Sequence, residues 1–184
     1  MPDCLKKLFY FLAADRTAVH FQAPKHAFKK LTPYVRYDLL FACCYVAVKQ
    51  AKLKGNTPEA DGLFAEAGKK YAEAVRIKPD MHEALYGWGN ALYEQAKTKS
   101  GAEADRLFHE ARSKFLQAEG IAPGTAAYDL ACISALHAQE VECLEWLEKS
   151  KAHADLPTRE HILNDPDLAN VRDKEWFQSF MARS

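Results

Sequence analysis

Three residue types that commonly bind zinc recur at intervals of three in the C-terminal half of the chain, at His137, Glu140 and Cys143. These three residues straddle a predicted turn between two helices, so that no single helical face carries them all. Residues 164–167 (Asn-Asp-Pro-Asp) resemble half of a calcium loop, but they lack the mid-loop glycine and the closing glutamate. We therefore predict no metal site, and we interpret the aspartate in this motif as a helix cap.

Catalytic signatures are absent from the sequence. It contains neither G-x-x-x-x-G-K-[ST] nor G-x-G-x-x-G, the loops whose backbone N–H groups bind phosphates. It also lacks the G-x-S-x-G turn that exposes a nucleophilic serine, and it has no H-E-x-x-H or C-x-x-C pair. We expect no catalytic residue and no cofactor, and hence a protein that is not an enzyme. If a site escaped these patterns, the His137, Glu140 and Cys143 group is where it would lie.

Composition indicates an ordinary globular protein with an uneven charge distribution. The 184 residues are 48% hydrophobic, and 25 basic residues balance 25 acidic ones, which excludes a polycation that binds nucleic acid. Residues 1–54 hold 10 Lys and Arg against 3 Asp and Glu, whereas residues 55–184 hold 15 against 22. The two parts therefore carry opposite net charges of +7 and −7.

Cysteine usage and apolar runs bear on localisation. The five cysteines have no framework spacing and no N-glycosylation motif occurs, which favours reduced thiols in the cytoplasm. No run approaches the ~20 apolar residues of a membrane-spanning helix. The best candidate for a membrane or signal segment, Leu8–Ala14, follows two lysines, and we interpret it as a packed amphipathic helix. A cleaved signal peptide and a helix on a membrane surface are the alternatives.

An internal repeat fills the middle of the chain. The sequence E-A-D-x-L-F-x-E-A at residues 59–67 recurs 44 positions later at residues 103–111, and Pro79 recurs as Pro123. In each copy the apolar residues follow the three-and-four spacing of one helical face, and the proline ends the helix. Upstream, residues 40–52 match residues 85–97 with a shift of 45, so each repeat unit reads as two helices.

These residues resemble the tetratricopeptide repeat (TPR) family, in which helix pairs carry small and large apolar residues in fixed order. The best-matched residues are Leu85, Trp88, Gly89, Leu92, Ala111, Phe115, Ala118 and Pro123. The resemblance covers residues 33–151 and implies an all-α, short right-handed α-solenoid. We expect helix pairs over residues 33–79, 80–123 and 124–155, an N-terminal basic and apolar helical segment (1–32) packing on them, and a C-terminal cap (156–184). Trp176, Phe177 and Phe180 are expected to seal the last apolar face.

The chain departs from the family in repeat length. The first two repeats are about ten residues longer than the usual 34. In this respect they are similar to the repeats of the plant mitochondrial import receptor, a tail-anchored TPR protein that binds presequences. Because no apolar span occurs at the C-terminus of this sequence, we interpret the similarity as shared helix length rather than shared function.

The resemblance implies a concave groove lined by the first helix of each repeat. Positions 2, 5, 9 and 12 of that helix form the groove in the family, and the third repeat matches less closely. Carried onto this sequence, the groove residues are Asp38, Phe41, Tyr45, Val48, Glu83, Tyr86, Asn90, Tyr93, Tyr128 and Cys132. Aromatic rings with polar tips dominate binding hot spots, which predicts a groove for an amphipathic helix or an extended apolar segment. The alternative is that the N-terminal or C-terminal segment of the same chain fills it.

One common activity of the family does not fit. Members that bind chaperone C-terminal tails hold the terminal carboxylate in a clamp of Lys, Asn and Arg residues. The matching positions here are Phe41, Tyr45, Gly87, a small residue near Ala126, and Asp129. Four are uncharged and one repels a carboxylate, so we do not expect chaperone tails to bind.

The sequence therefore predicts a non-enzymatic adaptor or scaffold that binds a protein or peptide segment. The first alternative is a peripheral membrane or organelle-import receptor that uses the basic N-terminal region, where Lys25, Lys29, Lys30 and Arg36 share a predicted helical edge. The second alternative is a structural homo-oligomer, in which the groove is an assembly surface. Nucleic acid is not an expected partner, and the sequence does not identify the protein partner.

Overall fold

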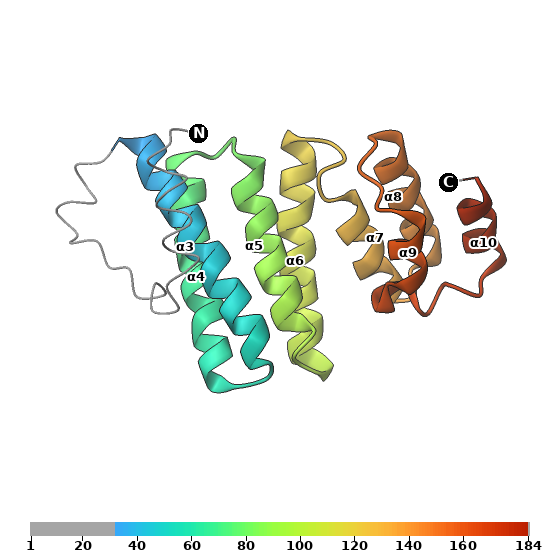
Figure 1. The fold of residues 1–184 in the computed structure, drawn as a ribbon, viewed down its shortest axis with the longest axis horizontal. Helices are drawn as coiled ribbons and strands as arrows, with labels where there is room; N and C mark the ends of the chain where they lie inside the picture. The colour runs from blue at the N-terminus through green and yellow to red at the C-terminus, as the bar shows by residue number, and fades with distance from the viewer. Residues whose placement is uncertain (1–31, 184) are drawn as a thin grey trace. The chain divides into compact units, whose positions relative to one another are not determined.

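The computed structural model describes residues 32–183, which form helices and connecting loops (Figure 1). Within this range the all-α prediction is confirmed, because no strand occurs and consecutive helices pack in pairs as in a helical solenoid. The elements are α3 (Pro33–Lys54), α4 (Pro58–Ile77), α5 (His82–Ala96), α6 (Gly101–Ile121), α7 (Ala127–Leu136), α8 (Glu140–Ala152), α9 (Arg159–Asn164), the 3-10 helix η2 (Pro166–Leu168) and α10 (Glu175–Ala182). The predicted N-terminal helical segment, with Lys25, Lys29 and Lys30, lies outside the described residues.

Two compact units make up the chain, residues 1–111 and 112–184. The predicted ranges 33–79, 80–123 and 124–155 contain α3 and α4, α5 and α6, and α7 and α8, respectively. The boundary between the units falls within α6 rather than between two repeats, and each unit is described by itself.

Threonine–proline pairs begin α3 and α4. The Thr32 and Thr57 hydroxyl oxygens accept hydrogen bonds from backbone N–H groups three residues later, at 3.5 and 3.2 Å. Pro33 and Pro58 follow at the first helical position, where no N–H is needed and the fixed backbone angle suits the helix. These pairs set the first residue of α3 and of α4, and thereby which side chains of each helix face the core.

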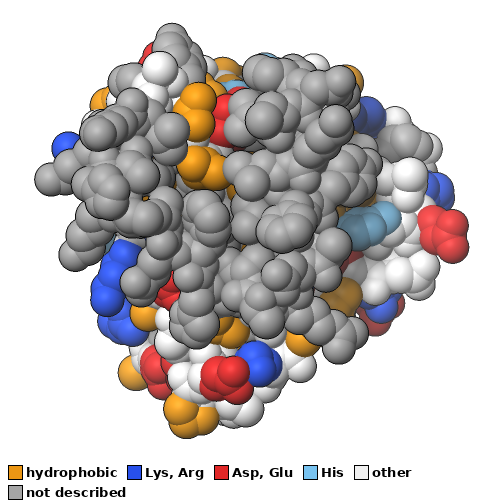
Figure 2. Space-filling view, turned by 60° about the vertical axis from the view of Figure 1, so that its left-hand side comes forward, with side chains coloured by type: hydrophobic (Ala, Val, Ile, Leu, Met, Phe, Trp, Pro, Cys, Tyr) orange, Lys and Arg blue, Asp and Glu red, His pale blue; other side chains and the backbone are white. Residues whose placement is uncertain are grey.

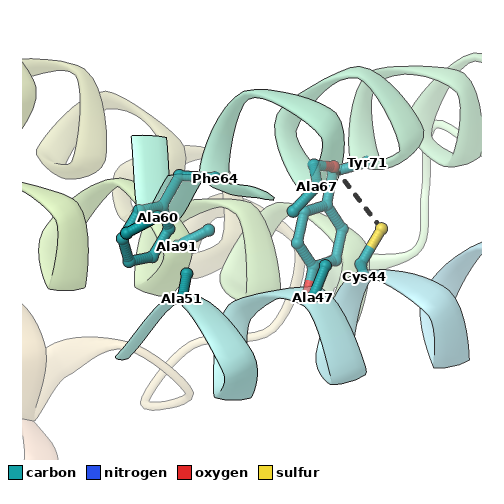
Figure 3. Close-up of a cluster of buried hydrophobic side chains, with 8 residues drawn as sticks. All are labelled: Cys44, Ala47, Ala51, Ala60, Phe64, Ala67, Tyr71 and Ala91. Carbon is teal, nitrogen blue, oxygen red and sulfur yellow. Dashed lines mark hydrogen bonds between the residues drawn. The ribbon is translucent and has the colours of Figure 1, made fainter. Parts of the chain in front are cut away.

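Small residues let α3, α4 and α5 approach closely in the first unit. Cys44, Ala47 and Ala51 of α3 face α4, where Phe64 and Tyr71 fill the space between alanines (Figure 3). The Cys44 thiol donates a hydrogen bond to the Ala67 carbonyl at 3.5 Å. Because the alanines keep the helices close, the two large rings are almost fully buried, with 3% exposure each.

Polar contacts join the ends of the long helices. Lys99, just beyond α5, binds the Asp61 carboxylate near the start of α4 at 2.7 Å and the Asn56 side chain at 3.0 Å. Gln95 donates a second hydrogen bond to Asp61 at 3.2 Å. The hydrogen bond from Lys99 is the main cause of the lowered pKa of Asp61. These contacts hold the start of α4 against the end of α5.

In the second unit, α7 packs against α8 and the C-terminal elements. The fully buried side chains of the second unit include Leu130, Ile133, Leu147, Ile162, Leu168, Val171, Phe177, Phe180 and Met181. Of the three predicted sealing residues, Trp176 is only partly buried, and its indole N–H donates to Glu140 at 2.8 Å. The Asp165 carboxylate accepts the Asp167 N–H at 2.9 Å and so caps η2.

A buried carboxylate fastens the loop between α6 and α7. Glu119, with 4% exposure, accepts backbone N–H groups of Gly124 and Ala126 at 3.0 and 2.6 Å and pairs with Lys149 at 2.8 Å. Gly124 has a φ of +98°, and a Cβ there would lie 2.4 Å from the Cβ of His153. Burial raises the pKa of Glu119, but the bonds from Lys149 and the two amides outweigh it and hold this pKa below its ordinary value.

We expect Glu119 to contribute to acid sensitivity. A carboxyl with a lowered folded-state pKa stabilises the fold above its unfolded-state value, near 4.5, and this contribution is lost as the pH falls through the lower, folded-state value. Glu119→Gln should reduce the free energy of unfolding near neutral pH by ~1–3 kcal/mol, and the gap to wild type should narrow in acid. Urea titrations at several pH values measure both effects.

Glu148→Gln is the control, because Glu148 pairs with Arg183 at the surface. A gap that stays constant with pH would contradict this assignment.

Candidate functional site

A groove of about 410 Å³ lies in the first unit, with walls from α3 and α5. Its lining combines aromatic rings, an amide and charged side chains. The lining residues are Phe41, Tyr45, Val48, Lys49, Lys52, Tyr71, Tyr86, Gly87, Asn90 and Glu94. Figure 2 shows hydrophobic, acidic and basic side chains interspersed where described residues are visible in that view.

Aromatic rings give the groove its apolar character. Phe41 meets the Tyr71 ring edge-on, with centroids 6.1 Å apart, and stacks with Tyr37 at 6.2 Å. Tyr45 is 46% exposed, and the Lys49 ammonium lies 5.4 Å from the centre of its ring. Aromatic surfaces of this kind offer a large contact area at a low cost in conformational entropy.

Gly87 lets the Tyr71 ring reach the groove from the core. A Cβ at Gly87 would lie 2.7 Å from the Tyr71 hydroxyl oxygen and 2.8 Å from two carbons of the ring. No side chain can occupy position 87 while the ring keeps its place. Burial raises the pKa of the Tyr71 phenol, which keeps the hydroxyl protonated. The ring is therefore shared by the hydrophobic core and the groove.

Polar side chains gather where α3 and α5 end. Asn90 supplies an amide that both donates and accepts hydrogen bonds. One turn beyond Asn90 on α5, Glu94 forms an ion pair with Lys52 of α3, with the ammonium nitrogen 2.6 Å from the carboxylate oxygen. This pair connects the two walls of the groove.

Five of the ten predicted groove residues line this groove: Phe41, Tyr45, Val48, Tyr86 and Asn90. The other five lie elsewhere. Asp38 and Glu83 are half-buried and do not line it. Tyr93 is buried with 5% exposure and packs edge-on against Phe108 of α6, with ring centroids 5.6 Å apart.

Tyr128 and Cys132 belong to the second unit, where the C-terminal segment covers them. The Tyr128 hydroxyl donates to the Asp165 carboxylate at 2.8 Å, and the Cys132 sulfur lies 3.9 Å from the same oxygen. His161 packs edge-on against the Tyr128 ring. In this unit the first-helix positions are therefore occupied by residues of the same chain.

The predicted groove residues do not include five of the lining residues: Lys49, Lys52, Tyr71, Gly87 and Glu94. Helical spacing offers a signal for three of them. Lys49, Lys52 and Glu94 follow Tyr45, Val48 and Asn90 by four residues, the interval that keeps side chains on one helical face. Tyr71 lies on the core face of α4 in the repeat pattern, and nothing local indicates that it also reaches the groove.

The arrangement suits binding rather than chemistry. Within residues 32–183, no group of three or more His, Cys, Asp or Glu side chains is placed to hold a metal ion. Burial raises the pKa of the Cys143 thiol to about 12, while Glu140 pairs with Lys174 and the His137 ring contacts the Ile133 carbonyl. The described cysteines are buried thiols with raised pKa values, which are poor nucleophiles.

A search for membrane spans in the described part of the chain finds no helix with the length and apolar character needed to cross a bilayer.

Comparison with known proteins gives one match. The family model described as plant-specific mitochondrial import receptor subunit TOM20 matches residues 50–156, which is more than half of the chain and includes the α5 wall of the groove. Neither the curated proteins nor the solved structures contain a match.

Proposed function

Since the chain belongs to the plant-specific mitochondrial import receptor subunit TOM20 family, we propose that it is a receptor subunit that binds mitochondrial targeting segments in the groove between α3 and α5. The family match supports the organelle-import receptor, predicted from the sequence as an alternative, better than the general adaptor. It agrees with a protein that binds other proteins and is not an enzyme. The predicted cytoplasmic location is wrong, because this is a family of mitochondrial import receptors.

The TPR resemblance also enters this proposal. The helix pairs α3–α4 and α5–α6 would be two elongated TPR-like repeats, and α7–α8 a third. In the basic N-terminal region, which the sequence suggested for receptor function, Lys25, Lys29 and Lys30 lie outside the described residues, whereas Arg36 of α3 pairs with Glu73 at 3.3 Å. The proposal therefore rests on the groove, which consists of described side chains.

The chemistry of the groove fits a targeting segment. Mitochondrial presequences form amphipathic helices that are rich in Arg and poor in acidic residues. The apolar face of such a helix matches a groove lined by Phe41, Tyr45, Tyr71 and Tyr86, in the helix-in-groove mode of recognition. A volume of about 410 Å³ is sufficient for a few apolar side chains but not for a whole helix, so the basic face would stay outside.

Charge in the groove is mixed. Among the lining residues, Lys49 and Lys52 of α3 are cationic, and the carboxylate that attracts a basic peptide is Glu94 in the α5 wall. The aromatic groove that α3 and α5 form together is the observation that carries the proposal.

Peptide binding tests this function. The full chain is titrated into a fluorescein-labelled, Arg-rich amphipathic presequence peptide, and anisotropy is followed. The control peptide has the same composition, with its apolar residues redistributed around the helix. We expect saturable binding that is at least about tenfold weaker for the control peptide, because hot-spot contacts depend on one apolar face. Equal affinities for the two peptides would contradict the proposal.

A further inference from the structure

The ion pair between Lys52 and Glu94 lies at the end of the groove where α3 and α5 finish. The ammonium nitrogen is 2.6 Å from the carboxylate oxygen, and 43% of the Lys52 side chain and 24% of the Glu94 side chain are exposed. Among the lining residues, Glu94 is the only carboxylate, while Lys49 and Lys52 are the two cations. Lys49 lies over the Tyr45 ring, 5.4 Å from its centre.

We propose that Glu94 binds a basic side chain of the targeting segment, and that Lys52 occupies this position until the segment displaces it. This inference rests on the proposed function, and it assigns the residue that selects a basic ligand. The Lys52–Glu94 pair then bridges the groove until a basic group of the ligand replaces Lys52. The ligand group it selects is a guanidinium directly beside the apolar face of the bound helix.

The exchange is favourable because the two cations differ. A guanidinium can donate two parallel hydrogen bonds to one carboxylate, whereas an ammonium acts as a point charge. An ion pair between partly exposed side chains contributes little to stability, so its loss is a small cost. The more exposed Lys52 can turn into solvent on its flexible stem, while Glu94 is the less exposed partner and stays in the wall.

A second ion pair of the same unit provides a matched control. Lys54, two residues after Lys52, pairs with Glu59 at 2.9 Å. Neither residue lines the groove, and Glu59 is 71% exposed. Removing one charge from the Lys54–Glu59 pair changes the net charge as much as the same change in the Lys52–Glu94 pair.

The test combines variants of the full chain with variants of the peptide. Affinities of wild type, Glu94→Gln, Lys52→Ala, Glu59→Gln and Lys54→Ala are measured by anisotropy against the presequence peptide and a series in which each Arg in turn is Gln. We expect Glu94→Gln to weaken binding of the parent peptide about fivefold and Lys52→Ala to strengthen it about threefold. For one peptide of the series, both effects should vanish. The control variants should change the affinity less than about twofold at physiological salt.

The outcomes separate this inference from the proposed function. If wild type binds the peptides but the effects of Glu94→Gln and Lys52→Ala are the same for every peptide of the series, then a basic ligand group does not displace Lys52 from Glu94. In that case the groove remains the binding site. If Glu59→Gln weakens peptide binding as much as Glu94→Gln does, the effect of Glu94→Gln is general electrostatic attraction, and the proposed contact between Glu94 and the ligand is wrong. If wild type binds no peptide of the series, the proposed function and this inference both fail.

Discussion

Phe115→Ala is expected to lower the free energy of unfolding by ~3–5 kcal/mol, the typical cost of truncating a buried aromatic ring. Phe115 is fully buried, with 0% exposure, and follows Tyr71 by the 44-residue repeat shift. Its removal leaves a cavity among well-packed helices and forfeits the burial of the ring. Urea denaturation followed by circular dichroism measures the change.

The control for Phe115→Ala is Leu53→Ala, because 88% of Leu53 is exposed. This variant should change the free energy of unfolding by less than about 0.5 kcal/mol. A loss below about 1 kcal/mol for Phe115→Ala would mean that the ring is not between the helices, and the register of the second repeat would then be incorrect.

Tyr86→Ala is expected to weaken binding of the presequence peptide by at least about tenfold, since aromatic anchors contribute most of the energy at such interfaces. Tyr86 is half-buried and lines the groove. The variant should change the free energy of unfolding by less than about 1 kcal/mol, because the ring is not part of the buried core. Anisotropy titration gives the affinity, and urea denaturation gives the stability.

Tyr93→Ala provides the opposite comparison on the same helix. Tyr93 is buried against Phe108 and does not line the groove, so its truncation should cost ~3–5 kcal/mol of stability. At temperatures where this variant stays folded, its affinity for the peptide should remain close to that of wild type. Loss of affinity in the Tyr93 variant with none in the Tyr86 variant would refute this assignment of the α5 faces.

Much of the fold follows from local patterns in the sequence. Thr32-Pro33 and Thr57-Pro58 begin α3 and α4, and Pro79 and Pro123 stand two residues beyond the ends of α4 and α6. The repeat itself supplies the pairing of helices, since each copy has one apolar face to bury. The all-α class was therefore predictable from the chain alone.

The groove was predictable only in part, because a helical position does not specify what packs against it. Tyr86 and Tyr93 lie two turns apart on α5, yet Tyr93 packs against the α6 ring of Phe108 whereas Tyr86 lines the groove. Asp165, 37 residues after Tyr128, binds the hydroxyl of that tyrosine, a contact that no periodicity encodes. The reach of Tyr71 into the groove depends on the missing side chain of Gly87, on a different helix.

Localisation was the least predictable property. Cysteine count and charge balance reflect the chemical environment of a chain, whereas the function of an import receptor depends on the proteins that it binds. The mitochondrial assignment comes from the family match over residues 50–156, and the composition carried no trace of it.

The most direct test of the receptor account is to map the bound peptide onto the chain. Unlabelled presequence peptide is titrated into the isotopically labelled full chain, and backbone amide chemical shifts are recorded by NMR. The account predicts shifts concentrated at Phe41, Tyr45, Tyr86, Asn90 and Glu94, with little change at Tyr128 and Cys132. Shifts concentrated in residues 112–184, or saturable binding that leaves the groove amides unchanged, would contradict it.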